Sequence, residues 1–182
     1  MIDIKKLSSH YNTRALDEAD ADMILEVCHQ NALFYEYTEA QPTGEQIQND
    51  MKLTPPGIDP SAKYFVGFFN DQDLVAVMDI IDGYPKPEIA YIGFFMMNRK
   101  YQGKHIGTAI IGEITAYLTT IGKTAVRLAI DKGNPQSTHF WKKNGFEIIS
   151  ETDINGWTKL VAERSTVSAR PKSSDTEIEL LN

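Results

Sequence analysis

Apolar residues near the start of the chain recur at the spacing of an amphipathic helix. Ile24, Val27 and Cys28 fall on one face of a helix that we expect to run from Asp17 to about Asn31. Asp17 is a suitable N-cap, because its carboxylate can accept hydrogen bonds from the free backbone N–H groups of the first turn. We interpret Cys28 as a core residue rather than a nucleophile, since no neighbour in the sequence would lower its pKa.

An aromatic-rich segment, Asn31–Ala40, leads from this helix to a second one. Its aromatic side chains either line a ligand pocket or pack a short helix against the core, and we favour the helix. The second helix begins after Thr43, because the run Thr43-Gly44-Glu45-Gln46 has the pattern of a capping box. Pro55-Pro56-Gly57 ends it.

The middle of the chain changes to runs that are typical of strands. Tyr64–Phe69 and Leu74–Ile80 predict a hairpin with a four-residue loop, Asn70–Asp73. Glu88–Met97 is the longest apolar run, which predicts a central strand buried on both faces. Gly93 inside it indicates a bulge or a close approach of another group to the backbone.

After this strand, the apolar residues again recur at the spacing of a helix. Apolar residues from Ile106 to Ile121 repeat every three or four positions, and Gly122 marks the end. A strand at Val126–Ile130 follows, and then a helix from Asn134 to Asn144 with Pro135 at its first position. Phe146–Ser150 and Thr158–Ala162 form a last hairpin around the turn Asn155-Gly156.

This order of elements predicts a mixed α/β (α+β) fold. The strand–helix–strand unit from Glu88 to Ile130 requires a parallel pair, whereas the hairpins require antiparallel neighbours. We expect one mixed, largely antiparallel sheet with helices on both faces. Residues 1–164 then form one domain, and residues 165–182 form a polar C-terminal tail or extension.

Composition and charge narrow the function classes. The chain has 182 residues, a net charge of −7 and a single cysteine, so it cannot form an intrachain disulfide or a cysteine-based metal cluster. We expect no signal peptide, no membrane span and a cytoplasmic location. An acidic chain is a poor binder of nucleic acid or of anionic membranes, so we expect neither as a partner.

The sharpest local feature is the turn Tyr101–Ala109, which leads from the apolar strand into a helix. Glycines in such a turn allow several backbone N–H groups to converge on a phosphate, and the helix dipole adds to the attraction. Glycine before a helix is also ordinary turn chemistry, so both interpretations stay open on this feature alone. The turn lacks the spacing of a Walker A loop and of a dinucleotide fingerprint.

A second segment, Asn134–Phe146, resolves the choice. It has an N-capping asparagine, then Phe140-Trp141, a lysine and Gly145-Phe146. Together with Gln102 and Gly107 in the turn, it resembles the GNAT superfamily of acetyl-CoA-dependent N-acetyltransferases over about residues 4–164. The resemblance implies a GNAT-like sheet whose central parallel strands splay apart and hold coenzyme A, with no metal.

The resemblance also assigns binding roles. It implies that the segment Gly103–Thr108 offers amides to the pyrophosphate, that Met96 and Met97 pair with pantetheine, and that an N–H near Phe95 polarises the thioester carbonyl. The implied cofactor-binding residues are Phe95, Met96, Met97, Gln102, Gly103, Lys104, His105, Ile106, Gly107, Thr108, Asn134, Trp141 and Lys143.

Three positions depart from the family pattern. His105 stands where the first motif glycine is usual, and we favour a tolerated substitution with the ring in solvent over a phosphate ligand. Trp141 replaces the tyrosine that commonly protonates the leaving thiolate, and an indole is no usable acid. Tyr91 replaces a strand glutamate, and Glu88 lies three residues earlier. Tyr91, Glu88 and Trp141 are therefore the catalytic candidates, and the general base stays unassigned.

The sequence thus predicts an acyltransferase that moves an acetyl group from acetyl-CoA to a primary amine of a small molecule or peptide. The amine attacks directly in a ternary complex, and the acidic balance favours a cationic amine. The alternative is a non-catalytic acetyl-CoA-binding sensor or scaffold, which the departures at Trp141 and Tyr91 favour. Because members of the family often dimerise, the resemblance also allows a homodimer.

Overall fold

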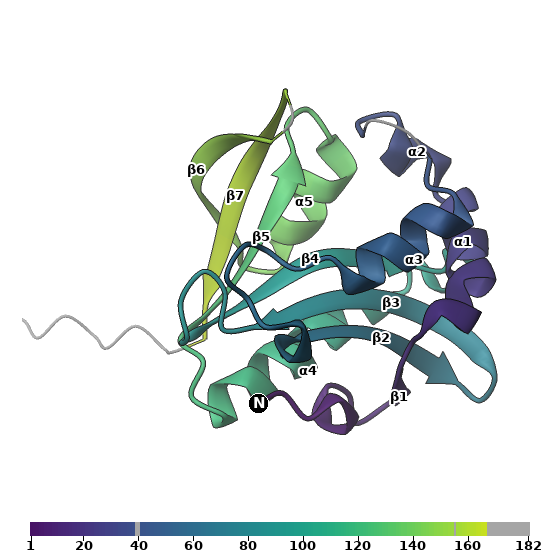
Figure 1. Ribbon diagram of the computed structural model, residues 1–182, viewed down its shortest axis with the longest axis horizontal. Coiled ribbons are helices and arrows are strands. Elements are labelled where there is room, and N and C mark those ends of the chain that lie inside the picture. The colour runs from purple at the N-terminus through teal and green to yellow at the C-terminus, as the bar shows by residue number, and fades with distance from the viewer. Residues whose placement is uncertain (39–40, 155, 167–182) are drawn as a thin grey trace, which may run out of the picture.

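The apolar runs in the middle of the chain pair into one sheet. The computed structural model describes residues 1–38, 41–154 and 156–166, and in these residues the sheet has seven strands in the order β1-β2-β3-β4-β5-β7-β6 (Figure 1). The strands are β1 (Asn12–Ala15), β2 (Lys63–Asn70), β3 (Asp73–Asp82), β4 (Ile89–Met97), β5 (Ala125–Asp131), β6 (Glu147–Ile154) and β7 (Trp157–Ser165).

The connection between β4 and β5 sets the topology. The α-helix between them crosses over the sheet, so β4 and β5 are parallel, as the sequence predicts. The other neighbouring pairs are antiparallel. The parallel pairing covers only four registered positions, from Ile89 opposite Ala125 to Ile92 opposite Leu128. Beyond Ile92 the two strands are no longer paired, which opens the sheet at its centre.

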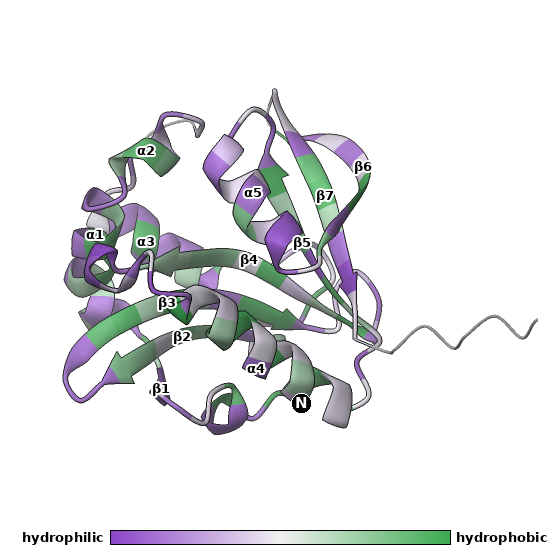
Figure 2. Ribbon diagram, turned by 180° about the vertical axis from the view of Figure 1, so that it is seen from behind, coloured by the Kyte–Doolittle hydropathy of each residue, from purple (hydrophilic) through white to green (hydrophobic). Residues whose placement is uncertain are grey.

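Helices cover both faces of the sheet. They are α1 (Ala21–His29), α2 (Ala32–Tyr35), α3 (Gly44–Lys52), α4 (Ile106–Thr120) and α5 (Pro135–Lys143), with single 3₁₀ turns at Ile4–Lys6, Glu18–Asp20, Pro60–Ala62 and Arg99–Tyr101. In Figure 1, α1 and α3 lie in front of β2–β4, and the reverse view of Figure 2 brings α4 in front of the same strands. Within the described residues, none of the helices is long and apolar enough to span a membrane.

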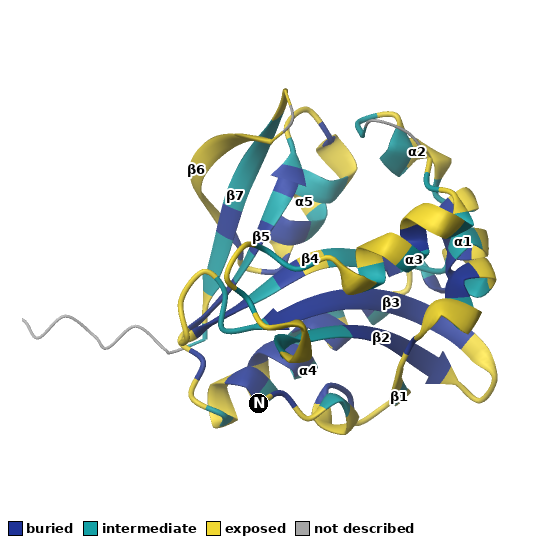
Figure 3. Cartoon of the chain, viewed as in Figure 1, coloured by how far each residue is buried: buried dark blue, intermediate teal, exposed yellow. Residues whose placement is uncertain are grey.

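The alternation of side chains along β2–β4 divides the core between these two faces. Ile110, Ile114 and Leu118 of α4 are buried together with Met78 and Ile80 of β3. On the opposite face, α1 and α3 bury a second cluster that includes Ile24, Val27, Ile47, Val77 and Met96. Figure 3 shows the result, with β3 buried along nearly its whole length. The central strands are therefore held rigidly from both sides, and they position the open end of β4.

Several expectations change in detail. The capping box at Thr43 is confirmed, because its side chain accepts from Gln46 N and the Gln46 side chain accepts from Thr43 N. The loop of the first hairpin is shorter than expected, because β2 extends to Asn70 and β3 already begins at Asp73. β1 has no counterpart in the sequence prediction, because a four-residue edge strand with one half-buried residue carries no apolar alternation.

The first two residues of the expected tail continue the last strand and its hydrogen bonding. Ser165 belongs to β7, and Thr166 N donates to Thr124 O over 3.0 Å. The rest of the tail, from residue 167, lies outside the described residues. The predicted turn at Asn155-Gly156 is described only at Gly156.

Candidate functional site

The separation of β4 from β5 creates a cleft of about 450 Å³. The C-terminal half of β4, the start of α4 and one side of α5 line it. Of the cofactor-binding residues expected from the sequence, eleven line this cleft: Phe95, Met96, Met97, Gln102, Gly103, His105, Ile106, Gly107, Thr108, Trp141 and Lys143. Segments more than 40 positions apart in the sequence therefore meet at one place.

A bulge shapes the wall that β4 contributes. Ile80 lies opposite Ile92 and Asp79 opposite Phe94, so Gly93 is the extra residue of β4, as the sequence predicts. Along this half of the strand the expectation of burial on both faces is wrong, since Gly93 is exposed and Phe95 is half-buried. The reason is the loss of β5 as a neighbour beyond Ile92.

The backbone of Phe95 faces the open edge of β4. Asn98 N donates to Val75 O over 2.9 Å, which places Asn98 in a hydrogen-bonded pair with β3. In an antiparallel ladder such pairs alternate with pairs whose N–H and C=O groups point away from the partner strand. Phe95, opposite Met78, is of the second kind. Its N–H group is therefore directed toward the cleft rather than toward β3.

The start of α4 presents a second set of backbone donors. Gly103 and His105 have positive φ angles of 72° and 59°, and this path turns the chain into the helix at Ile106. In the described part of the chain, the backbone N–H groups from Gly103 to Thr108 have no hydrogen-bond acceptor. Unsatisfied donors at a helix N-terminus favour an anion. Lys143, also on the cleft, adds a positive charge.

Gly107 allows the helix to start this close to α5. A Cβ atom at this position would lie 3.2 Å from Cε2 of Phe140 and 3.5 Å from the sulfur of Met97. The contact with Phe140 is tight for a Cβ atom, and the distance to Met97 is an ordinary van der Waals contact. The glycine thus keeps the floor of the cleft free of a side chain.

Two expected binding residues have other contacts. The side chain of Gln102 donates to Asn31 Oδ1 over 2.6 Å and to Met97 O over 3.1 Å, so it braces the rim of the cleft. Lys104 is exposed, does not line the cleft, and donates to Lys100 O over 3.0 Å. The structure gives Lys104 no contact with the free N–H groups.

Asn134 lies just outside the cleft lining but retains an unused donor. Its Oδ1 accepts from Ser137 N over 2.9 Å, which caps α5 as expected. The residue is buried, and its Nδ2 has no hydrogen-bond partner. A buried unpaired amide is costly unless a ligand completes it. Because Gln136 and Ser137 line the cleft, a ligand there can supply the missing acceptor.

Trp141 lies in a cluster of aromatic rings. Its ring centroid is 5.0 Å from that of Phe140, 5.0 Å from that of Phe146 and 6.0 Å from that of Phe95. The residue is 7% exposed and reaches the cleft wall. The indole therefore packs in the core and forms part of the cleft wall.

The two other catalytic candidates lie away from the cleft lining. Tyr91 is half-buried on β4 before the bulge, with its ring 5.2 Å from that of Tyr84, and burial raises its pKa to about 12. Glu88 is exposed and precedes β4 at the end opposite the cleft. Glu88 lies seven positions before Phe95, or about 23 Å at the usual rise along a strand. This distance removes the reason to consider Glu88 as a base.

Sequence reasoning missed part of the lining. The additional residues are Asn31, Phe34, Tyr101, Gln136, Ser137, His139 and Phe140. Phe34 shows that both interpretations of the aromatic segment hold, since it lies on the short helix α2 and also lines the cleft. On α5, helical spacing from Trp141 and Lys143 would have found Ser137, Gln136 and Phe140.

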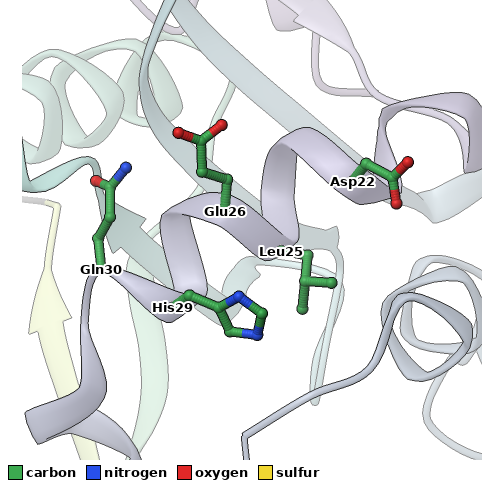
Figure 4. Close-up of a pocket in the computed structure, with 5 residues that line it drawn as sticks. All are labelled: Asp22, Leu25, Glu26, His29 and Gln30. Carbon is green, nitrogen blue, oxygen red and sulfur yellow. The ribbon is translucent and has the colours of Figure 1, made fainter.

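A second hollow, on the outer face of α1, does not have this character. Its lining residues are Asp22, Leu25, Glu26, His29 and Gln30, all from one helix and its C-cap (Figure 4). No other element contributes a group that converges on them. In the described ranges, no group of three or more His, Cys, Asp or Glu side chains is arranged to hold a metal ion.

Comparison with known proteins agrees with this geometry. An uncharacterized N-acetyltransferase of Methanocaldococcus jannaschii is 30% identical over 81 residues, which cover 44% of this chain but only 35% of that protein. A chimera of a Vibrio cholerae spermidine N-acetyltransferase has a TM-score of 0.65 at 17% identity, with 87% of this chain and 96% of that chain covered.

A third relative was solved with coenzyme A. It is the PaiA N-acetyltransferase of Thermoplasma acidophilum, with a TM-score of 0.60 at 19% identity and coverage of 85% of this chain and 98% of that one. The acetyltransferase (GNAT) family matches residues 25–146, which contain β4, α4, β5 and α5. The chain therefore belongs to the GNAT family of acetyltransferases.

Proposed function

We propose that this chain transfers the acetyl group of acetyl-CoA to a primary amine, and that the cleft between β4 and β5 binds the acetyl-CoA. The observation that carries the proposal is the convergence of two sets of free backbone donors on one cleft. The N–H groups from Gly103 to Thr108 suit the pyrophosphate, and the N–H of Phe95 suits a thioester carbonyl. The buried Nδ2 of Asn134 suits an amide oxygen of the pantetheine arm.

The residues of the cleft favour direct attack by the amine. A backbone N–H directed at the carbonyl oxygen stabilises the negative charge that develops there, so no covalent enzyme intermediate is needed. Cys28 is unsuited to form one, because it is 1% exposed, lies on α1 and has a pKa raised by burial. Acetyl transfer then depends on positioning both substrates and on removing a proton from the amine.

The acceptor we propose is a cationic primary amine on a small molecule or peptide. The net charge of −7 favours a cation over an anion as the second substrate. Spermidine, named for the relative from Vibrio cholerae, is an amine of this class. The helices α1–α3 cover the face of β4 on which such a substrate approaches.

A non-catalytic acetyl-CoA-binding module is the second candidate. Trp141 favours it, because an indole N–H cannot serve as the acid for the leaving thiolate. The loss of this acid does not exclude catalysis, since a thiol with a pKa near ~8.5 leaves as a thiolate without assistance. We therefore favour the enzyme.

One experiment separates the two candidates. The protein is incubated with acetyl-CoA and a panel of polyamines, amino acids and short peptides, and free thiol is measured over time. We expect thiol release that depends on the amine, with an acetylated product of the corresponding mass. Calorimetric binding of acetyl-CoA without release for any member of the panel would favour the sensor or scaffold instead.

A further inference from the structure

A carboxylate lies buried beneath the bulge of β4. Asp79 of β3 is 8% exposed, and its Oδ2 accepts from Nζ of Lys63 over 2.7 Å. The other oxygen, Oδ1, is buried and has no hydrogen-bond partner among the described residues. A carboxylate oxygen without a donor is costly in a protein interior, because hydration is lost and nothing replaces it.

Gly93 leaves this carboxylate close to the opening of the sheet. A Cβ atom at Gly93 would lie 2.5 Å from Oδ2 of Asp79, so no side chain fits there without moving the carboxylate. Gly93 is itself exposed, and it is the first residue of β4 beyond the last pair with β5. Asp79 does not itself line the cleft, but its carboxylate packs against the backbone of β4 at the point where the two strands diverge.

The two residues that follow Gly93 on β4 lie on opposite sides of the sheet. Phe94, opposite Asp79, packs with the cluster under α1 and α3, whereas Phe95 contacts Phe140 on the other side. The bulge thus brings the Asp79 face and the open backbone edge of Phe95 within two residues of each other on β4. An amine that enters beside Gly93 to reach a thioester carbonyl at Phe95 would pass next to the Asp79 carboxylate.

We propose that Oδ1 of Asp79 is the general base that accepts the proton of the substrate amine, in the role for which the sequence offers no residue. The proposal rests on the acetyl transfer proposed above. The ammonium of the substrate transfers a proton to Asp79, and the freed lone pair of nitrogen forms the N–C bond to the acetyl carbon. The C–S bond breaks, the nitrogen loses its second proton to solvent, and the thiolate of coenzyme A takes up a proton from solvent. The Asp79 carboxyl then releases its proton to solvent.

The charges around Asp79 are compatible with this role. Burial raises its pKa, and Asp50 of α3 raises it further, whereas Lys63 of β2 lowers it. Tyr91 of β4 also faces this charge, and its own pKa is raised partly by Asp79. A base with a raised pKa accepts a proton from an ammonium more readily than an exposed aspartate does.

The test compares Asp79→Asn with Asp82→Asn. Asp82 is on the same strand and pairs with Lys123 at the end away from the cleft, so it controls for the loss of an ion pair. We expect Asp79→Asn to lower kcat by about 10²- to 10⁴-fold with little change in acetyl-CoA affinity. Its remaining activity should rise with pH as free amine accumulates. Asp82→Asn should keep kcat within about threefold.

Lys63→Gln gives a readout that a purely structural role would not produce. Because Lys63 lowers the pKa of Asp79, its removal should move the acidic limb of the kcat/KM profile to higher pH. If Asp79→Asn does not fold because Lys63 is left unpaired, the double variant Lys63→Met with Asp79→Asn avoids an isolated buried charge.

Two outcomes overturn the inference in distinguishable ways. If the folded Asp79→Asn variant has the rate and pH profile of the wild type, the role of Asp79 is overturned and the acetyl transfer stands. Wild-type protein that binds acetyl-CoA but acetylates no amine would overturn the proposed function and this role together.

Discussion

The side-chain amide of Gln102 donates to Oδ1 of Asn31 over 2.6 Å, across 71 positions of sequence, and both residues donate from their amide nitrogens to the carbonyl of Met97. Asn31 also donates to Val27 O of α1 over 2.8 Å. The two amides therefore tie the end of α1 to the end of β4 and to the turn before α4. One carbonyl oxygen therefore joins the segment after α1, the end of β4 and the turn before α4.

This relationship predicts how Gln102→Ala behaves. We expect a loss of about 1 kcal/mol in the free energy of unfolding for Gln102→Ala and for Asn31→Ala, measured by urea denaturation. The losses should not add in the double variant, because the two amides share partners. Acetyl-CoA and S-acetylpantetheine should lose affinity by the same factor. A loss confined to acetyl-CoA would show instead that Gln102 contacts the phosphates.

Gly107 provides a test of the cleft with a control on the same helix. We expect Gly107→Val to reduce acetyl-CoA affinity at least ~10-fold, because the added side chain meets Phe140 and Met97 and fills the floor of the cleft. Gly112→Val is the matched control, since no heavy atom lies within 4 Å of a Cβ built there. Calorimetry on both folded variants decides. Equal affinities would place the phosphate site elsewhere.

His105 allows backbone strain to be separated from ring chemistry. Its φ of 59° is a left-handed conformation that costs a non-glycine residue roughly 1 kcal/mol. His105→Gly relieves this strain, but glycine also raises the entropy of the unfolded chain, which offsets part of the gain. We expect a net rise in Tm of about 2 °C. His105→Ala keeps the strain and removes only the ring. A fall in acetyl-CoA affinity for both variants would show that the imidazole binds phosphate.

The sequence predicts the fold well because most elements carry a strong local signal. The apolar run of β4, the repeats of α4 and the capping asparagine of α5 each determine one element, and their order requires the parallel pair. β1 lacks such a signal, because its edge position needs few buried residues. The homodimer and the cytoplasmic location stay predictions.

The site is predictable only where the backbone forms it. The turn before α4 acts through main-chain N–H groups, which follow from the positions of glycine and the helix start. Asp79 could not be found in this way, because its role depends on the bulge at Gly93 and on Lys63 from another strand. A single aspartate in an apolar strand shows neither its partner nor its unpaired oxygen. Gln102 lines the cleft, but its motif position does not show that its side chain also binds Asn31 and Met97.

Glu113 of α4 predicts a pH dependence of stability. Burial raises its pKa, but donors from Ser8, Ser9 and His10 outweigh this effect and hold the pKa at about 2, below the ordinary 4.5. The stabilisation is therefore complete above pH ~4.5 and is lost as the pH falls toward ~2. We expect Glu113→Gln to cost about 1 to 2 kcal/mol at pH 7 and almost nothing at pH 2.

The control for this effect is Glu26→Gln, an exposed glutamate on α1. The free energy of unfolding of Glu26→Gln should equal that of the wild type at every pH. A difference between Glu113→Gln and wild type that stays constant from pH 7 to pH 2 would contradict the assignment.

Trp141 tests whether an acid can be restored beside the sulfur. Trp141→Tyr places a phenol, with an ordinary pKa near ~10, on a residue that lines the cleft, where indole cannot donate as an acid. Trp141→Phe removes a similar volume without the hydroxyl, so it isolates the packing effect. Both variants leave a gap among Phe95, Phe140 and Phe146 and should lose about 1 to 3 kcal/mol of stability.

Thermal unfolding measures this loss of stability in Trp141→Tyr and Trp141→Phe. Turnover per folded molecule, with one fixed amine, measures the chemistry, and we expect Trp141→Tyr to equal or exceed the wild-type rate and to exceed Trp141→Phe. If both variants are slow while folding and acetyl-CoA affinity are intact, then the indole itself positions the thioester, because neither the hydroxyl nor the lost volume explains an equal fall.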